Sequence, residues 1–291
     1  MNLSNVFSKV AHTATHLGRH AEEIVAPTLI KPKRFPYGAF RFALTLPKNT
    51  PFTVLASPDL TNWTPIGQDT AGEAACEYID SQAFNFNHRF YQVAVKSALS
   101  NVIGYTSTTA SPGFSMIACP LVGDTNSVEE VLMGWADGAA LTRFDPLQFR
   151  LKENHLDSGK WTAPHDRFLP GEGALLFNPT SDYKSINFVG EVRQGEQSVP
   201  VPAGFSLRSA LGPRFGRLVE DLKFPIADGD VIHLFDRDRQ GYTIHSYEHG
   251  KWDTESPVLG LCEAFWIGKT AAANWRHTIE IASPLLNSNL A

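Results

Sequence analysis

Cysteine is scarce in this chain. Only three cysteines occur in 291 residues, Cys76, Cys119 and Cys262, with no C-x-x-C pair and no histidine at ligand spacing. This distribution excludes a disulfide framework and a zinc motif. We therefore expect buried free thiols, which behave as small apolar side chains.

Positive charge and long apolar runs are also lacking. The net charge is −5 and the only local basic cluster is Lys31, Lys33 and Arg34, so no basic field is available for nucleic acid. No stretch approaches the roughly 20 apolar residues of a membrane span. The N-terminus shows neither the apolar core nor the cleavage site of a secretory signal. We expect no nucleic acid partner and no membrane span.

Apolar and turn-forming residues, in contrast, are plentiful. Hydrophobic residues make up 43% and aromatic residues 11% of the chain, which also has 22 Gly and 19 Pro. These proportions are typical of a globular protein built from short strands and tight turns. The length suffices for two or three domains.

The stretch from 112 to 281 contains two tandem copies of one sequence unit. Gly113 recurs as Gly204, and 204 minus 113 gives an offset of 91 that we expect to hold without a gap through the unit. Several matches in one register indicate a tandem duplication. The matched segments are Gly113 to Ser115 with Gly204 to Ser206, Ala136 to Gly138 with Ala227 to Gly229, Phe144-Asp145 with Phe235-Asp236, Gly159 to Trp161 with Gly250 to Trp252, and Glu172 with Glu263.

Each copy is predicted to be rich in strands. It opens with a strand, at 114–120 or 205–211, and a short helix follows. Ser127 and Glu130 form a capping-box signature for that helix in the first copy, and 218–222 takes its place in the second. Asp-Gly turns precede strands ending in Phe-Asp. The remaining strands are predicted at 174–178 and 186–189, and at 264–268 and 278–281.

Catalytic motifs are absent. There is no G-x-S-x-G elbow, no phosphate loop and no paired Cys and His context. Glu172 and Glu263 lie at apolar strand entrances, where acid catalysis is one interpretation. Because the two glutamates recur at one position of the repeat, we favour the interpretation that their carboxylates accept backbone hydrogen bonds. Ser115 and Ser206 recur with the first strand of each copy and are interpreted as structural. We predict a protein that is not an enzyme and has no cofactor.

Residues 1–27 are predicted to form an amphipathic helix ended by Pro27. His12, His16 and His20 fall on its polar side, where solvated histidines are favoured over a metal site. A lone helix of this kind is marginal in water, so its apolar stripe must pack on this chain or on another subunit. The proposed assembly contacts on the stripe are Leu3, Val6, Phe7, Val10, Leu17 and Ile24.

A linker at 28–36 and a small β-sandwich at 37–98 are expected next. The strings Ala56-Ser57-x-Asp59-Leu60-x-Asn62-Trp63 and Arg89-Phe90-Tyr91-x-Val93 resemble a short sandwich module appended to many bacterial surface proteins, over about residues 38–97. The resemblance places Trp63 in the core and Asp59 with Asn62 in the turn that presents it. A sugar site at Trp63 is the alternative.

The duplicated unit also carries a resemblance. Asn101-Val-x-Gly104-Tyr105, Pro112-Gly113-Phe114-Ser115, Phe144-Asp145-Pro146 and Pro170-Gly171-Glu172-Gly173 are similar to an uncharacterised repeat in secreted and surface-associated bacterial proteins. This resemblance implies an extracellular or cell-surface location and no particular activity. Without a recognisable signal peptide, assembly in the cytoplasm also stays open.

Two sets of residues are candidate ligand contacts. Asp236, Asp238 and Gln240, followed by Gly241, approach the start of a calcium loop, but a hairpin turn explains them equally well. Trp161 and Trp252 recur in phase, which favours packing. The tryptophans that do not recur, and are therefore candidates for surface contact, are Trp135, Trp266 and Trp275.

The sequence thus predicts a mainly β protein. It comprises the N-terminal helix, the small sandwich, two tandem β-rich domains at 99–192 and 193–283, and a tail at 284–291. Its predicted function is that of a structural subunit that self-assembles into a bacterial filament, tube or surface layer. The second possibility is an adhesin module that binds a glycan or a cell surface. The third is a hydrolase that uses Glu172 or Glu263.

Overall fold

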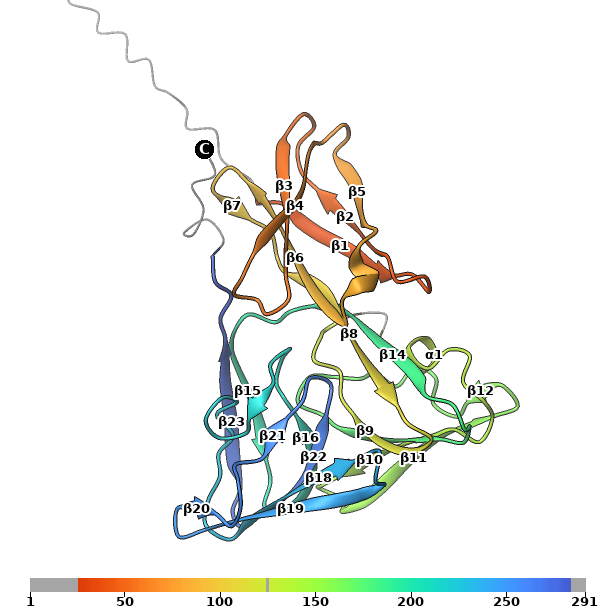
Figure 1. Ribbon diagram of the computed structural model, residues 1–291, viewed down its shortest axis with the longest axis vertical. Helices are drawn as coiled ribbons and strands as arrows, with labels where there is room; N and C mark the ends of the chain where they lie inside the picture. Colours follow the sequence, from red (N-terminus) through yellow and green to blue (C-terminus); the bar gives the residue numbers. More distant parts are fainter. Residues whose placement is uncertain (1–25, 124–125, 284–291) are drawn as a thin grey trace, which may run out of the picture.

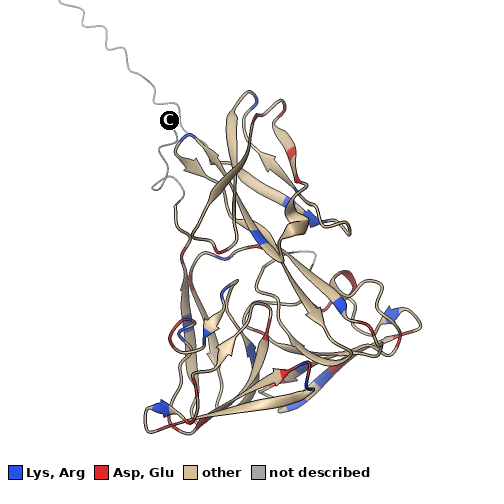
Figure 2. Cartoon of the chain, in the orientation of Figure 1, with Lys and Arg blue, Asp and Glu red and all other residues tan. Residues whose placement is uncertain are grey.

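The computed structural model describes residues 26–123 and 126–283. These residues are mainly β, as predicted, and the strands form a sandwich module and two repeat sheets (Figure 1). The predicted helix over 1–27, with its apolar stripe and histidines, and the tail at 284–291 lie outside the described residues, apart from 26–27. Lys, Arg, Asp and Glu are interspersed over all three parts (Figure 2).

The sandwich packs a three-stranded sheet, in the order β1-β2-β5, against a larger sheet in the order β14-β8-β6-β3-β4 with β7 beside β6. Alternation along β2 puts Phe40, Phe42 and Leu44 into the core, as the period of two predicts. The elements are β1 (Thr28–Arg34), β2 (Phe40–Thr45), β3 (Pro51–Ser57), β4 (Thr64–Thr70), β5 (Ala75–Asp80), η1 (Ala83–Asn85), β6 (His88–Val95), β7 (Ala98–Leu99), β8 (Ile103–Ala110) and β14 (Lys184–Glu191).

The predicted linker at 28–36 is wrong for most of its length, because β1 is an edge strand paired with β2. Its register shifts between Ile30 and Lys33, on either side of Pro32. Proline has no N–H for a ladder and is tolerated at an edge or bulge, so the bulge lets an extended, proline-containing segment join the sheet.

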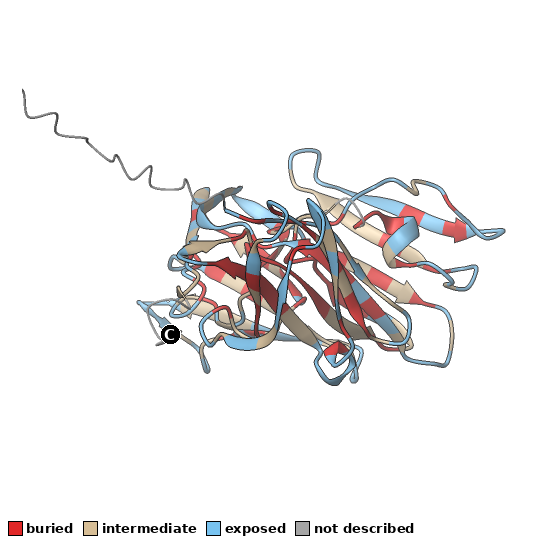
Figure 3. Ribbon diagram, turned by 90° about the horizontal axis from the view of Figure 1, so that it is seen from above, coloured by how far each residue is buried: buried red, intermediate tan, exposed pale blue. Residues whose placement is uncertain are grey.

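The larger sandwich sheet runs on into the first repeat. β8 and β14 pair with each other, and β8 also pairs with β6. The expected boundary between 98 and 99 therefore falls inside one sheet, at β7. One core joins Phe90 of the sandwich to Leu141 and Trp161 of the first repeat. Figure 3 shows buried residues concentrated along the inner strands.

The two repeat sheets have one topology and one register. The orders are β12-β11-β10-β13-β9 and β20-β19-β18-β22-β16, and Ala140↔Phe177 in the first recurs as Val231↔Gly268 in the second, at the offset of 91. The elements are β9 (Gly113–Ile117), α1 (Val128–Val131), β10 (Ala140–Asp145), β11 (Arg150–Asp157), β12 (Lys160–Trp161), β13 (Ala174–Asn178), β15 (Gly195–Val201), β16 (Gly204–Ser209), β17 (Gly216–Arg217), β18 (Asp230–Asp236), β19 (Gly241–Glu248), β20 (Lys251–Trp252), β21 (Val258–Leu259), β22 (Ala264–Lys269) and β23 (Ala273–Ile279).

The offset does not hold to the end of the unit. β13 ends at Asn178 and β14 begins at Lys184, whereas β22 ends at Lys269 and β23 begins at Ala273. The second connection is thus two residues shorter, and the expectation of an ungapped repeat to 281 is wrong. Consequently Trp275 aligns with the buried Ile186 of the first copy, and it is buried as well.

The short helix also differs between the copies. In the first it is α1, where Ser127 Oγ donates to Glu130 Oε2 at 2.8 Å, while the Val128 and Glu129 N–H groups donate to the carbonyls of Asp166 and Pro164. The side chains therefore do not form the predicted box with the backbone. In the second copy 218–222 is a turn, and the predicted helix is wrong there.

The repeats pack on each other with approximate two-fold symmetry. Ala118 N donates to the Cys262 carbonyl, and the equivalent Ser209 N donates to the Gly171 carbonyl. The cluster between the sheets contains matched pairs from the two copies: Met116 with Leu207, Phe144 with Phe235, and Leu175 with Trp266. The apolar outer face of each repeat sheet is thus covered by the equivalent face of the other repeat sheet.

Several smaller predictions are confirmed. Asp59 Oδ1 accepts hydrogen bonds from the N–H groups of Thr61 and Asn62, and Trp63 packs against the core. Cys119 and Cys262 are buried free thiols, and burial raises their pKa values, that of Cys262 to about 12. Cys76 is a free thiol but only half-buried, so the prediction of a buried thiol is wrong there.

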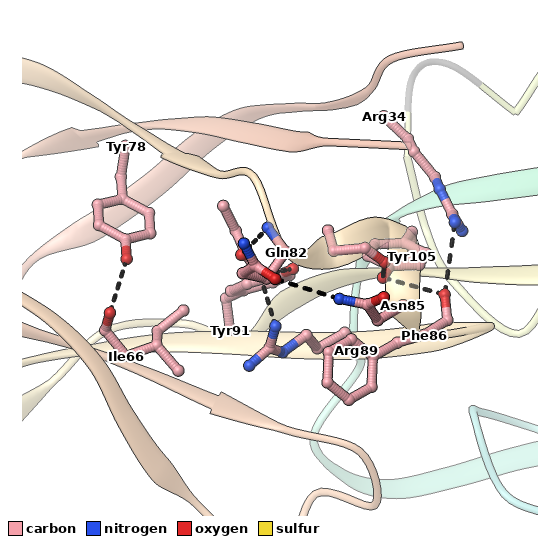
Figure 4. A network of polar contacts seen from close by, with 11 residues as sticks. Arg34, Ile66, Tyr78, Gln82, Asn85, Phe86, Arg89, Tyr91 and Tyr105 are labelled. Atoms are coloured by element: carbon pink, nitrogen blue, oxygen red, sulfur yellow. Dashed lines mark hydrogen bonds and ion pairs between the residues drawn. The ribbon is translucent and has the colours of Figure 1, made fainter. Parts of the chain in front are cut away.

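A buried ion pair holds the sandwich. Arg89 Nη1 and Tyr91 Oη each lie 2.8 Å from Asp80 Oδ2, and Asp80 is 6% exposed. Figure 4 shows Arg89 and Tyr91 among the polar contacts of this region. We expect Asp80→Ala to lower the free energy of unfolding by about 3 kcal/mol, because it leaves Arg89 unpaired in a buried position. In the exposed Arg41–Glu77 pair, Glu77→Ala is expected to cost less than about 1 kcal/mol. Urea denaturation measures both, and equal losses would contradict the assignment.

A second buried pair makes the second repeat sensitive to acid. Burial by itself would raise the pKa of Asp230, but hydrogen bonds from Lys269, Thr270 and Ala227 outweigh it, so the pKa lies below the usual value. The carboxylate therefore stabilises the fold above about pH 4 and loses this effect as pH falls through its lowered pKa. The difference in unfolding free energy between the wild type and Asp230→Asn should be constant from pH 7 to 5 and shrink below pH 4. A difference independent of pH would refute this account.

Candidate functional site

An apolar groove opens where the two repeat sheets diverge. It has a volume of about 420 Å³, and its lining residues lie on β10, β11, β16, β18, β19 and β22 and in the turn between β10 and β11. Figure 1 shows these strands of the two repeats at the end of the molecule away from the sandwich. Both repeats contribute to the lining, three residues from the first and four from the second. The lining residues are Phe144, Phe149, Leu151, Phe205, His233, Tyr242 and Trp266.

Alternation along the strands explains why these side chains gather. On β18, His233 and Phe235 point to the face that meets the first repeat, while Ile232 points into the second core. Trp266 pairs across the ladder with His233, so it lies on the same face. The inner part of this face is covered by the other repeat, and the outer part forms the groove.

The rim of the groove exposes large apolar side chains. Phe149 is 69% exposed and Leu147, in the same hairpin turn, is 90% exposed. Phe205 and Tyr242 are also exposed on the facing repeat. Contiguous exposed apolar surface of this kind marks an interaction site.

The pseudo-equivalent position on the other side is closed. There Gln240 lies across the start of β9: its Oε1 accepts the Phe114 N–H at 2.7 Å and its Nε2 donates to the Phe114 carbonyl at 2.9 Å. Arg237 Nη1 donates to the Thr109 carbonyl at 2.6 Å. We call Arg237 and Gln240 the polar latch.

The open and closed sides differ in their side chains and not in their backbone conformation. Phe149 and Gln240 are equivalent and both have left-handed backbone conformations, with φ of 48° and 53°. A Cβ added to Gly113 would lie 2.6 Å from Gln240 Oε1, whereas a Cβ on the equivalent Gly204 would meet nothing within 4 Å. Pro146 replaces Arg237 on the open side. The first repeat therefore lacks both latch residues.

The groove is uncharged. Of its lining residues, only His233, Tyr242 and Trp266 carry polar side-chain atoms. Burial lowers the pKa of His233, so its imidazole is neutral at pH 7. The nearby Lys152 is paired with Asp145 at 3.0 Å. The groove is thus suited to an apolar ligand and offers no anchor for a charged one.

The three candidate tryptophans differ in their surroundings and exposure. Trp266 lines the groove, with its ring 5.2 Å from that of Phe144 in an edge-on contact. Trp135 is half-buried against the first core. Trp275 is fully buried, and its Nε1 donates to the Leu222 carbonyl at 2.8 Å, so the prediction that it contacts a surface ligand is wrong. Trp161 and Trp252 pack against cores, as predicted.

The residues resembling a calcium loop build a hairpin turn. Asp236 Oδ1 accepts the N–H groups of Asp238 and Arg239 at 2.9 and 3.0 Å, and Gln240 is held in the latch. Asp145 makes the same turn bonds in the first repeat. Within 26–123 and 126–283, no group of three or more His, Cys, Asp or Glu residues has the geometry of a metal site.

The recurring glutamates and serines lie outside the groove. Glu263 Oε2 accepts the Gly260 N–H at 2.8 Å, in line with the predicted backbone bonding. The backbone of Glu172 forms an isolated antiparallel β-bridge with that of Arg208, and the symmetric β-bridge joins Glu263 to Ile117. Both glutamates therefore lie where the repeats meet. Ser115 and Ser206 are buried.

Comparisons with known proteins identify no family. No protein-family model matches the chain, and no curated protein does. A solved structure described as a tetra-tandem repeat in the extending region of a large adhesion protein aligns with 7% identity and a TM-score of 0.22, over 88% of this chain and 74% of that chain. A TM-score this low carries no functional argument.

The sequence does not predict most of the residues that line the groove. Trp266 was the one lining residue named as a candidate, whereas Phe149, Phe205 and Tyr242 were not. A usable signal existed in the comparison of the copies: at the equivalent turn positions, Pro146, Leu147 and Phe149 replace Arg237, Asp238 and Gln240. An apolar turn in one copy opposite a polar turn in the other marks the place where the duplication diverged.

The polar latch yields a stability prediction. Gln240→Ala is expected to lower the free energy of unfolding by about 1 to 2 kcal/mol, because two hydrogen bonds between the repeats are lost. Phe149→Ala is the matched control at the equivalent position and should change it by less than about 1 kcal/mol, since this side chain is mostly exposed. Urea denaturation gives both values. Equal effects would mean that the latch contributes nothing.

Proposed function

We propose that this protein is a non-catalytic structural subunit that self-assembles, and that the aromatic groove is one of its contacts. The observation that carries the proposal is the broken symmetry of the repeats. One side is closed by polar hydrogen bonds, while the equivalent side exposes Phe149 and Leu147 at an apolar groove. Exposing such side chains is costly in water unless a partner covers them.

The composition of the groove favours a polypeptide partner. Aromatic residues are enriched in the buried centres of protein interfaces, and charged residues are depleted there. The groove follows this pattern, with five aromatic side chains besides Leu151 and neutral His233. Contacts of this heterologous kind, in which a surface of one copy meets a different surface of the next, produce open filaments when the rotation does not close.

Glycan or cell-surface binding is the second candidate. Trp266, Tyr242 and Phe205 provide rings on which the apolar face of a sugar can stack. The groove, however, has few polar side chains to pair with sugar hydroxyls. The shortage of polar side chains therefore favours a polypeptide partner over a glycan. Among the described residues, no helix is both long and apolar enough to cross a membrane.

The proposal is tested by the state of association of the full chain. We expect the wild type to form large assemblies as concentration rises, and Phe149→Gln to weaken the contact by about 2 kcal/mol, or roughly 30-fold in Kd. Phe215→Gln is the control, because Phe215 is similarly exposed, at 59%, and lies outside the groove.

Light scattering with electron microscopy of the same samples measures the effect. A wild type that stays monomeric at every concentration would overturn self-assembly. If it instead binds polysaccharide with a change in tryptophan fluorescence that Trp266→Ala abolishes, the glycan candidate takes its place.

A further inference from the structure

We propose that the groove receives the N-terminal apolar stripe of a second copy of this chain. This inference rests on the proposed self-assembly and names the segment that fills the site. The part of the stripe that fits is its first cluster, Leu3, Val6, Phe7 and Val10.

The spacing of this cluster matches one mode of peptide recognition. The four residues are at i, i+3, i+4 and i+7, which places them on one face of two helical turns. Amphipathic helices dock into hydrophobic grooves through anchors at this spacing. A short isolated helix is marginal in water, so the sequence favours a helix that is completed on binding.

The chemistry of the two surfaces also agrees. The groove contains no ion pair or charged side chain in its lining, and the cluster contributes only aliphatic and aromatic groups. Phe7 can make edge-on contacts with rings such as Phe149 and Trp266, which are preferred between aromatic side chains. Burial of both surfaces removes the exposed apolar area that each carries alone.

The position of the segment favours a neighbouring copy. The described chain begins at Ala26, next to β1 of the sandwich, whereas the groove lies among β10, β11, β18 and β19 at the other end of the molecule (Figure 1). A segment that joins the described chain at one end, and a groove at the other end, are arranged for a head-to-tail contact between copies. Repetition of that contact adds copies in a line.

Two full-length variants, each with one damaged surface, test the inference by mixing. The stripe variant carries Phe7→Asp and Val10→Asp, and the groove variant carries Pro146→Arg and Phe149→Gln, which copy the polar latch. Each alone should be monomeric. Mixed in equal amounts, they should form a one-to-one dimer and nothing larger, because the only intact stripe and the only intact groove then bind each other.

Controls separate folding from binding. His16→Asp places a charge in the same segment on its polar side and should assemble like the wild type. Urea denaturation should show no lowering of the unfolding midpoint in any variant; for the groove variant this is expected because Phe149 is mostly exposed.

Other outcomes have distinct meanings. If the groove variant is monomeric but the stripe variant assembles normally, the stripe is not the occupant, and groove-dependent self-assembly stands. If the wild type assembles but mixing of two monomeric variants restores nothing, binding in trans is refuted. A wild type that is always monomeric overturns both the inference and the proposed function.

Discussion

The apolar contact between the two repeat sheets organises the rest of this structure. Each sheet has one face on its own core, and its other face carries Met116, Phe144 and Leu175 or their counterparts Leu207, Phe235 and Trp266. A sheet with two apolar faces needs a covering layer on both. Here each copy covers the other, and the approximate two-fold symmetry follows because the two faces descend from one sequence pattern.

That symmetry explains where a site is able to form. The covered area is limited to the inner part of each face, so two equivalent outer parts are left, one on either side. The second repeat closes one of them with Arg237 and Gln240, which bond to the backbone of the first. At the other, Pro146 and Phe149 have no such bonding capacity, and an apolar groove results. Duplication supplied two copies of one backbone, and different residues at a few turn positions give a polar latch on one side and an apolar groove on the other.

The sandwich, at the opposite end of the molecule from the groove, is continuous with the first repeat. Its larger sheet accepts β8 and β14 of the first repeat, so the sandwich and this repeat share both a sheet and a core. In the second repeat the corresponding strands, β15 and β23, form a two-stranded sheet of their own. The sandwich is thus joined to the first repeat by continuous hydrogen-bonded strands.

The sequence by itself determined the local pattern. The offset of 91 follows from matched segments, and the strands around Phe40 to Leu44 and the mainly β class follow from periodicity and turn chemistry, which act over a few residues. The Asp59 turn is implied by the resemblance to a sandwich module. Only the tertiary structure decided which layer covers each apolar face. Trp266 and Trp275 look alike in sequence, yet one lines a groove and the other is enclosed by the second core. The physical reason is that alternation assigns a side chain to a face of its strand, whereas its exposure depends on residues far away in the chain.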